Sequence, residues 1–313
     1  MFNNQIFEDI IEFPDPDAQK HFSQLVGLDE IKDRLIKEIR LLLSPDLLKE
    51  WSEQHHKGPV GLLEHFQNRP PFFIFGGDIG TGKTSLAESL GDPLARQEKI
   101  PVTLYRLSLN ARGSGAVGEM TRLLSEAFKE VREAARKGIS QKAKPSSAII
   151  FVIDEADALA QSREFDQMHH EDRAGVNAVI RGIDSITSTH APAVIIMCTN
   201  RLEAIDPAVK RRAAEIFEFK RPNEKQMIAL LEQGLNGTDI SPTQISHLAK
   251  AMGPNGSRAY GCTHSDLMRR FLPILLLDAF PNKPIEYKRA LEIAKSLQPT
   301  PPFSAKACKG KRH

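Results

Sequence analysis

The fold of this chain is decided by the stretch Gly77-Asp78-Ile79-Gly80-Thr81-Gly82-Lys83-Thr84, which follows an apolar run at 72–75 and precedes a helix-like segment. The stretch matches the pattern G-x-x-x-x-G-K-[ST] in the strand-to-helix context that this pattern requires. Glycines let the backbone curl, so that successive N–H groups point at phosphate oxygens. Lys83 would reach the β- and γ-phosphates of a nucleotide, and the Thr84 hydroxyl would complete the shell of a Mg²⁺ ion. We therefore predict a phosphate-binding loop; the alternative is a glycine-rich turn that binds nothing.

The composition of the chain excludes several classes of protein. Its 313 residues, 41% hydrophobic and 26% charged, are typical of a soluble globular protein with one large or two moderate domains. The net charge of +2 gives no case for a nucleic-acid or membrane partner. The three cysteines lack metal-ligand spacing, no secretory signal begins the chain, and no apolar stretch is long enough to span a bilayer. We expect a cytoplasmic protein.

Apolar runs alternate with helical segments in the chain before residue 221. The runs at 102–107, 148–153 and 193–198 are predicted strands, and the last two have the continuous apolar character of strands buried on both faces. Amphipathic helices are predicted at 119–137 and 176–186. This order predicts an α/β fold: a P-loop three-layer sandwich with a parallel sheet, followed by a small all-α lid domain.

Shifts in composition divide the chain into four predicted parts. Residues 1–21 are acidic and proline-containing, and we expect an arm without a core of its own. Residues 22–220 form the predicted P-loop domain. From 221 to 297 the branched runs disappear, which predicts a helical lid. Its predicted helices lie at 224–235, 243–252, 263–280 and 284–297. Residues 298–313 end in lysines and an arginine and are expected to form a basic, flexible tail.

Polar residues follow the two predicted central strands. Asp154 and Glu155 end the first of these strands, and Asn200 ends the second. Open α/β sheets bind ligands beyond the carboxyl ends of their strands. Asp154 would hold Mg²⁺, and Glu155 would polarise an attacking water as a general base. Asn200 could help to position that water, although an asparagine at a strand end is more often a turn residue.

Two adjacent arginines form a further candidate site. Arg211 and Arg212 end the segment Ile205-Asp206-Pro207-Ala208-Val209-Lys210-Arg211-Arg212. An arginine delivered by a neighbouring subunit is a recurrent way to stabilise the transition state of phosphoryl transfer. The alternative is a solvated basic helix end near a C-terminal dipole. The segment alone favours neither reading.

These motifs resemble, from about Phe22 to Leu297, the AAA subgroup of the AAA+ ATPases. The phosphate loop matches Walker A, and Ile150-Phe151-Val152-Ile153-Asp154-Glu155-Ala156-Asp157 matches Walker B. Asn200 falls at sensor 1, and the segment at 205–212 is similar to the one that ends in arginine fingers. Leu25-Val26-Gly27-Leu28 resembles the stretch that cradles adenine. Gly261-Cys262-Thr263-His264-Ser265-Asp266-Leu267 resembles the lid signature, with Ser265 at the position where other AAA+ groups carry a sensor 2 arginine.

The resemblance implies ATP and Mg²⁺ as cofactors, with Mg²⁺ held by Thr84 and Asp154. The residues that it implies in nucleotide binding are Val26, Gly27, Gly77, Asp78, Ile79, Gly80, Thr81, Gly82, Lys83, Thr84, Ser85 and Asp154. The residues that it implies in catalysis are Glu155, Asn200, Arg211 and Arg212.

The resemblance also implies an ATP-hydrolysing ring, expected to be a hexamer of this chain, that remodels a protein substrate. Gly175-Val176-Asn177-Ala178-Val179-Ile180-Arg181-Gly182-Ile183-Asp184 resembles the ATPases that remodel HORMA-domain proteins in meiotic checkpoints and bacterial anti-phage operons. A HORMA-domain protein is therefore an expected partner. The alternative is a nucleic-acid-directed ATPase of the clamp-loader or transposition-regulator type, against which the near-neutral charge argues.

Two positions depart from the AAA pattern. The expected pore loop, Gly115-Ala116-Val117-Gly118-Glu119, lacks the aromatic residue that usually grips a translocating polypeptide. The second arginine often found beyond the first fingers would fall near Ile216, which is not basic. The first departure bears on the strength of substrate grip, and the second bears on the assignment of the arginine fingers.

Overall fold

The computed structural model describes residues 6–67, 69–108, 119–140, 144–156, 170–254 and 258–303. The chain divides into two compact units. We call the first, Met1–Gln24, Ile31–Gly76 and Thr84–Glu218, the α/β unit. The second, Leu25–Glu30, Gly77–Lys83 and Phe219–His313, is the helical unit. Most of the predicted phosphate loop thus groups with the helical unit.

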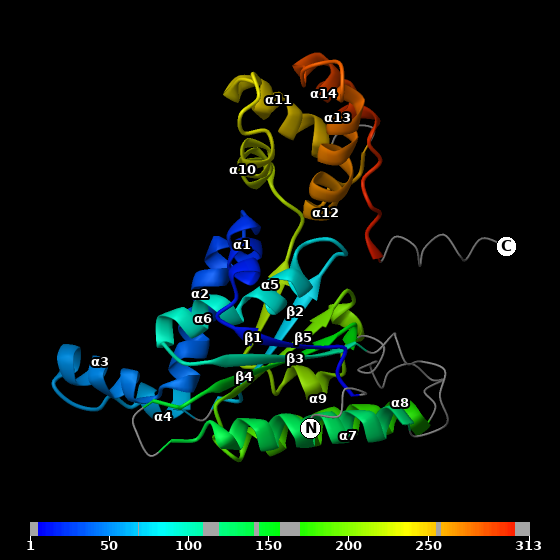
Figure 1. Ribbon diagram of the computed structural model, residues 1–313. Helices are drawn as coiled ribbons and strands as arrows, with labels where there is room; N and C mark the ends of the chain where they lie inside the picture. Colours follow the sequence, from blue (N-terminus) through cyan, green and yellow to red (C-terminus); the bar gives the residue numbers. More distant parts are fainter. Residues whose placement is uncertain are drawn as a thin grey trace. The chain divides into compact units, whose positions relative to one another are not determined.

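A mixed sheet with the strand order β1-β3-β4-β5-β2-β6 forms the centre of the α/β unit (Figure 1). Its strands are β1 (Asp9–Phe13), β2 (Phe72–Gly77), β3 (Val102–Ser108), β4 (Ala148–Asp154), β5 (Ala193–Thr199) and β6 (Glu215–Phe219). The pairs β3–β4, β4–β5 and β2–β5 are parallel, whereas β1 runs antiparallel to β3. The predicted α/β fold with a parallel central sheet is confirmed.

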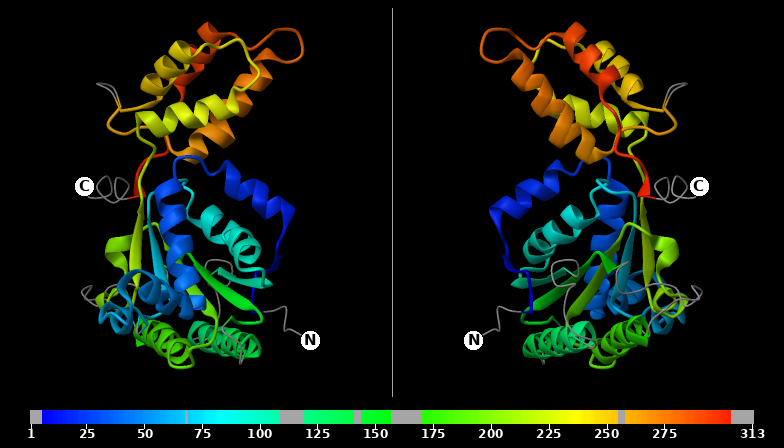
Figure 2. Two further views of the ribbon diagram at one scale, coloured as in Figure 1. Left: turned by 90° about the vertical axis from the view of Figure 1, so that its left-hand side faces the viewer. Right: turned by 90° about the vertical axis from the view of Figure 1, so that its right-hand side faces the viewer.

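The central strands are buried because their runs of apolar residues face helices on both sides. Every residue of β5 is buried, and in β4 only Asp154, at the end, is partly exposed. Figures 1 and 2 show α7 (Glu119–Lys137) and α8 (His170–Thr187) together on one face of the sheet. Phe128 of α7 packs edge-on against Phe151 of β4, with ring centroids 5.1 Å apart. The close packing leaves the strand ends as the polar edge of the sheet.

The remaining helices of the α/β unit lie around the sheet or within the connections between its strands. Their bounds are α1 (Pro16–Gln24), α2 (Asp29–Leu43), α3 (Asp46–His56), α4 (Leu62–Gln67), α5 (Lys83–Ser89), α6 (Gly91–Glu98), α9 (Pro207–Lys210) and the 3₁₀ turn η3 (Leu202–Ala204). The short helix α4 lies between α3 and β2.

The acidic N-terminal segment differs from the predicted arm, because it belongs to the sheet. β1 pairs with β3 from Asp9↔Arg106 to Phe13↔Val102. Phe7 and Phe13 are buried at 4% and 3% exposure, and Phe7 stacks edge-on against Tyr105 of β3. Apolar and acidic residues come mostly in pairs at 6–13 and do not show the strict alternation that predicts a half-buried strand. Their pairing partners lie about a hundred residues away in the sequence.

The helical unit has its own core beneath amphipathic helices (Figure 2). Its elements are α10 (Glu224–Gly234), α11 (Pro242–Met252), α12 (His264–Asp266), the π-helical turn η4 (Leu267–Phe271), α13 (Leu272–Ala279) and α14 (Tyr287–Ser296). Capping boxes begin α10, at Asn223, and α11, at Ser241, where side chains satisfy backbone N–H groups left open in the first turn. The helix predicted at 263–280 is present but is interrupted by η4.

The segment predicted to begin a flexible tail is held in place at its start. Thr300 donates hydrogen bonds from its N–H (3.0 Å) and its hydroxyl (2.7 Å) to the carboxylate of Asp266. The helical unit therefore extends beyond the predicted boundary at residue 297, and the remainder, 304–313, lies outside the described residues. Within the described chain, no helix combines the length and apolar character needed to cross a membrane.

Candidate functional site

The predicted phosphate loop joins β2 to α5, and its glycines adopt conformations that other residues rarely take. The backbone angle φ is +78° at Gly80 and +97° at Gly82, in the left-handed region that favours glycine. A Cβ atom on Gly80 would lie 2.7 Å from Cβ of Ser265, in the lid signature. A larger residue at this position would displace that neighbour, so the close approach requires glycine.

The lysine of the phosphate-loop pattern donates hydrogen bonds within the loop itself. Lys83 is 6% exposed, and its Nζ donates hydrogen bonds to the carbonyl oxygens of Gly77 (2.9 Å) and Asp78 (2.7 Å). The Thr81 hydroxyl donates to the same Asp78 carbonyl at 2.8 Å. A bound phosphate would therefore compete with loop carbonyl groups for the Lys83 ammonium. Thr84 and Ser85 follow in the first turn of α5, half-buried and exposed respectively.

The segment predicted to contact adenine packs in the helical unit. The Gly27 carbonyl accepts a hydrogen bond from Nε2 of Gln226 at 2.6 Å, and Val26 packs against the core of that unit. A Cβ atom on Gly82 would lie 3.2 Å from a methyl carbon of Leu28. The helical unit thus contains both the predicted adenine segment and loop residues 77–83.

The carboxyl end of β4 carries the predicted acidic pair. Asp154 Oδ1 accepts a hydrogen bond from the N–H of Glu155 at 2.9 Å. Glu155 has φ of +54°, an unusual value for a residue other than glycine. The register aligns Thr199 of β5 with Gly76 of β2, and Asn200 follows Thr199 directly. Because β4 and β5 are parallel neighbours, Asp154 and Asn200 follow adjacent strand ends, where ligands bind in such sheets.

Arg106, a residue that sequence reasoning missed, lies beside this acidic pair. Its Nη1 is 2.7 Å from Glu88 Oε1 and its Nη2 is 3.8 Å from Asp154 Oδ2. The same guanidinium lies 3.7 Å from Glu8 and 3.5 Å from Asp9. Burial raises the pKa of Glu88 above its ordinary value; Arg106 opposes this shift, and Asp154 adds to it. The sequence offered one indication of this role: Arg106 is the only charged residue in the strand at 102–108.

The acidic surplus at this strand end can attract a cation but does not enclose one. One arginine faces four carboxylates there. Among the described residues, no three His, Cys, Asp or Glu side chains are grouped as a ready metal site. A Mg²⁺ ion typically takes only one or two protein carboxylates and completes its shell with water and phosphate oxygens. The donor set around Asp154 fits that kind of site.

The two adjacent arginines have different environments, although the sequence left them equivalent. Arg212 donates from Nε and Nη2 to the carboxylate of Asp184 at 2.8 and 3.0 Å, and from Nη1 to the Ala208 carbonyl at 3.0 Å. Arg211 is exposed. In the part of the chain that the structure describes, no hydrogen bond or ion pair of its guanidinium is seen. Arg211 is thus the one of the two whose side chain can reach outward.

Two further expectations concern the pore loop and the end of the Walker B match. The pore loop at 115–118 and Asp157 lie outside the described residues, and α7 begins at Glu119. Ile216, where a further arginine finger would fall, lies in β6 and is 38% exposed. The structure therefore supplies no arginine at that position.

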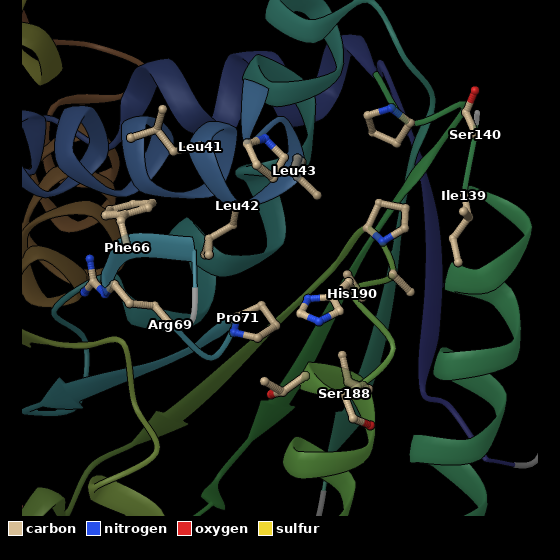
Figure 3. Close-up of a pocket in the computed structure, with 17 residues that line it drawn as sticks. Leu41, Leu42, Leu43, Phe66, Arg69, Pro71, Ile139, Ser140, Ser188 and His190 are labelled. Atoms are coloured by element: carbon tan, nitrogen blue, oxygen red, sulfur yellow. The ribbon is translucent and has the colours of Figure 1, made fainter. Parts of the chain in front are cut away.

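A pocket of about 340 Å³ lies elsewhere in the α/β unit, and Figure 3 shows its lining. Pro71 and Ala193, at the amino ends of β2 and β5, contribute to it together with Leu42, Phe66 and Arg69. Asp154 and Asn200 follow the opposite, carboxyl ends of the central strands. None of the predicted site residues lines this pocket.

Comparisons with known proteins agree with the motifs. The family model described as "ATPase family associated with various cellular activities (AAA)" matches residues 73–221. The CD-NTase-associated protein 6 of Escherichia coli (strain MS 115-1) is 48% identical over 300 residues, covering 96% of each chain. The family match spans the phosphate loop, both central strand ends and Arg211.

Solved structures give the same result. A chain of the E. coli MS115-1 HORMA:CdnC:Trip13 complex matches with a TM-score of 0.88 and 48% identity, over 95% of this chain and 97% of that one. Rhizobiales Trip13 matches with a TM-score of 0.76 and 42% identity, over 95% and 100% of the two chains. These likenesses do not favour the clamp-loader alternative. The chain belongs to the AAA family of ATPases and is a protein-remodelling ATPase of the group that contains CD-NTase-associated protein 6.

Proposed function

We propose that this chain is a Mg²⁺-dependent ATPase that works as a homo-oligomeric ring, expected to be a hexamer, and remodels a HORMA-domain protein. The observation that carries this proposal is its likeness, at 48% identity over nearly the whole chain, to a chain solved in a complex with a HORMA protein. The cytoplasm is the proposed compartment. Cys198 and Cys262 are buried thiols that form no disulfide within the described residues, the form that a reducing compartment maintains.

The phosphate loop supplies the proposed contacts to the nucleotide. Lys83 would exchange the two loop carbonyls for phosphate oxygens, and the N–H groups of 80–85 would donate to the same phosphates. Val26 and Gly27 would contact the adenine. Thr84 and Asp154 would hold Mg²⁺, which neutralises charge on the phosphates when it is bound. Among the described residues, the ion-pair partner of Asp154 is Arg106 at 3.8 Å, too distant for a hydrogen bond, so this carboxylate keeps acceptor capacity for a ligand.

The strand ends supply the proposed catalytic groups. Glu155 would accept a proton from the attacking water, and Asn200 would hold that water by its amide. Arg211 would serve the nucleotide of a neighbouring subunit, since its guanidinium is exposed. Arg212 is already bound to Asp184 and would hold the segment that presents Arg211. The helical unit would act as the lid that responds to the nucleotide.

Substrate trapping tests this proposal. Glu155→Gln should keep ATP binding and lose turnover, because the amide occupies the same space but cannot accept the proton. With ATP and the HORMA protein of the E. coli MS115-1 complex as the probe, this variant should form a stable complex on size exclusion, whereas the wild-type chain should release the substrate. Wild-type turnover by Glu155→Gln contradicts the base assignment, and absence of both binding and stimulation by the HORMA-domain protein contradicts the proposed substrate.

A further inference from the structure

The phosphate loop contains an acidic residue where its proposed ligand is anionic. Asp78 is the one acidic residue between Gly77 and Lys83, and its side chain is 25% exposed. A carboxylate close to bound phosphates repels them, since like charges disfavour one another at short range. It would also offer the Lys83 ammonium an internal partner, because the backbone carbonyl of Asp78 already accepts a hydrogen bond from Lys83 Nζ. Phosphate binding therefore requires a cationic partner that neutralises the Asp78 carboxylate.

Arg221 occupies it. Its Nε donates to Asp78 Oδ2 at 2.8 Å, and the pair is mostly buried, with side-chain exposures of 13% for Arg221 and 25% for Asp78. The guanidinium also lies over the ring of Tyr260, 4.9 Å from the centroid. A charge-assisted hydrogen bond in such a sheltered place is about twice as strong as a neutral one. The carboxylate of Asp78 is thus neutralised by a cation outside the loop.

The same guanidinium joins the loop to two other segments of the helical unit. Nη1 donates to the Gly261 carbonyl at 2.7 Å, directly before the lid signature. Nη2 donates to the Thr300 carbonyl at 2.8 Å, in the segment that follows α14 (red in Figure 2). Asp266 fixes that segment in turn, through the N–H and hydroxyl of Thr300. Each side of the Arg221 fork therefore has a defined partner.

We propose that Arg221 is a positioning residue for the nucleotide: it neutralises Asp78, keeps Lys83 available for phosphate, and links the loop to the lid signature and the segment at 298–303. This inference rests on the proposed ATPase function and deepens it. Without Arg221, the Asp78 carboxylate would face the phosphates uncompensated and would pair with Lys83. The loss would depend on the charge at residue 78 and on the number of phosphates in the ligand.

A double-mutant cycle tests the proposal by calorimetric titration of ATP and ADP. Arg221→Ala should weaken ATP binding roughly tenfold to a hundredfold, the range expected when a charged hydrogen bond is lost. Asp78→Asn completes the cycle, and Arg221→Ala/Asp78→Asn should bind ATP at least about tenfold more tightly than Arg221→Ala, because the effects of interacting residues are not additive. The loss in Arg221→Ala should be larger for ATP than for ADP.

A matched control separates this role from general support of the lid. Arg258 also donates to three backbone carbonyls of the helical unit, those of Ala251, Ala294 and Lys295, at 2.8, 2.9 and 2.6 Å, but no carboxylate accepts these bonds. Arg258→Ala should lower the melting temperature of the lid without a loss of ATP affinity that Asp78→Asn can reverse. A double mutant as weak as Arg221→Ala would overturn the proposal.

Two results distinguish a failure of the proposed role of Arg221 from a failure of the proposed ATPase function. If the wild-type chain binds no ATP, the proposed function fails; if it binds ATP and the cycle shows no coupling, only the role of Arg221 fails. Should Arg221→Ala not fold, Asp78→Asn still decides, because a loss of ATP affinity of tenfold or more in that variant would show that the carboxylate itself serves the ligand.

Discussion

Asp78 in the loop and Asp154 at the end of β4 each lie beside an arginine, but the two pairs differ. Asp78 accepts a hydrogen bond of 2.8 Å from Arg221, whereas Asp154 lies 3.8 Å from Arg106, whose closer partner is Glu88 at 2.7 Å. The first pair is closed, since a neighbour already satisfies the charge. The second is open, since the carboxylate keeps acceptor capacity. An open charge can take a ligand, and a closed one shapes the site around it.

The largest test of this contrast uses the two adjacent arginines, of which Arg212 is closed by Asp184 and Arg211 is open. Arg211→Ala should lower turnover on the order of a thousandfold with ATP affinity little changed, since a finger acts on the charge of the transition state. Arg212→Ala should lower the melting temperature more than Arg211→Ala does. Steady-state ATPase assays and thermal melts of both variants measure this.

Mixed rings check that Arg211 acts on a neighbouring subunit. Arg211→Ala and Lys83→Ala chains should each be inactive alone, and mixtures should regain some turnover at junctions that pair an intact loop with an intact Arg211. Equal turnover losses in Arg211→Ala and Arg212→Ala would remove the distinction between open and closed arginines.

A second test exchanges the two aspartates for asparagine. Asp154→Asn should lower Mg²⁺-dependent turnover by at least about a hundredfold, because the open carboxylate is the proposed metal ligand and its charge stabilises the bound ion. Asp78→Asn should lower turnover much less, because its carboxylate is already paired with Arg221. Titration of Mg²⁺ in the ATPase assay measures both. A larger loss in Asp78→Asn would reverse the comparison.

A third test removes Arg106, the cation beside Asp154 and Glu88. Arg106→Gln should destabilise the α/β unit by about 3 kcal/mol, since the partly buried Glu88 and Asp154 lose their shared partner. The loss should be greater at pH 8 than at pH 5. Burial already raises the pKa of Glu88, so protonation at low pH relieves the repulsion. Arg122→Gln is the control, since Arg122 is 72% exposed and 3.7 Å from Glu126. Equal losses at the two pH values would contradict the assignment.

The smallest test concerns a third acid beside arginines. Glu38 lies 3.4 Å from Arg69 and 3.8 Å from Arg34, yet burial and a hydrogen bond with Glu215 raise its pKa from 4.5 to about 7. A raised carboxyl pKa stabilises the fold below the ordinary value of 4.5, and this contribution is lost as pH rises through 7.

Glu38→Gln should therefore be more stable than the wild-type chain at pH 8 by on the order of 1 kcal/mol, and nearly equal to it at pH 4.5. Chemical unfolding at the two pH values measures the difference, with Glu126→Gln as an exposed control. A destabilised Glu38→Gln at pH 8 would show that the nearby arginines outweigh burial at this carboxyl group.

The sequence by itself determined the phosphate loop, the central strands and the acidic pair at 154–155. These features depend on local order: glycines at fixed spacing allow one backbone path, and continuous apolar runs can only be buried on both faces. The helix predicted at 224–235 also depends on local order, and the structure shows that the Asn223 side chain caps its first turn.

Tertiary structure alone decided which charges are open and which are closed. Arg221 meets Asp78 across 143 residues of sequence, and Asp9 of β1 meets Arg106 across 97. Arg212 is separated from Asp184 by 28 residues, so its difference from Arg211 was equally hidden. The type of a side chain determines its charge, but its partners depend on the sheet register and helix packing that bring distant segments together. Local sequence patterns therefore do not predict these partners.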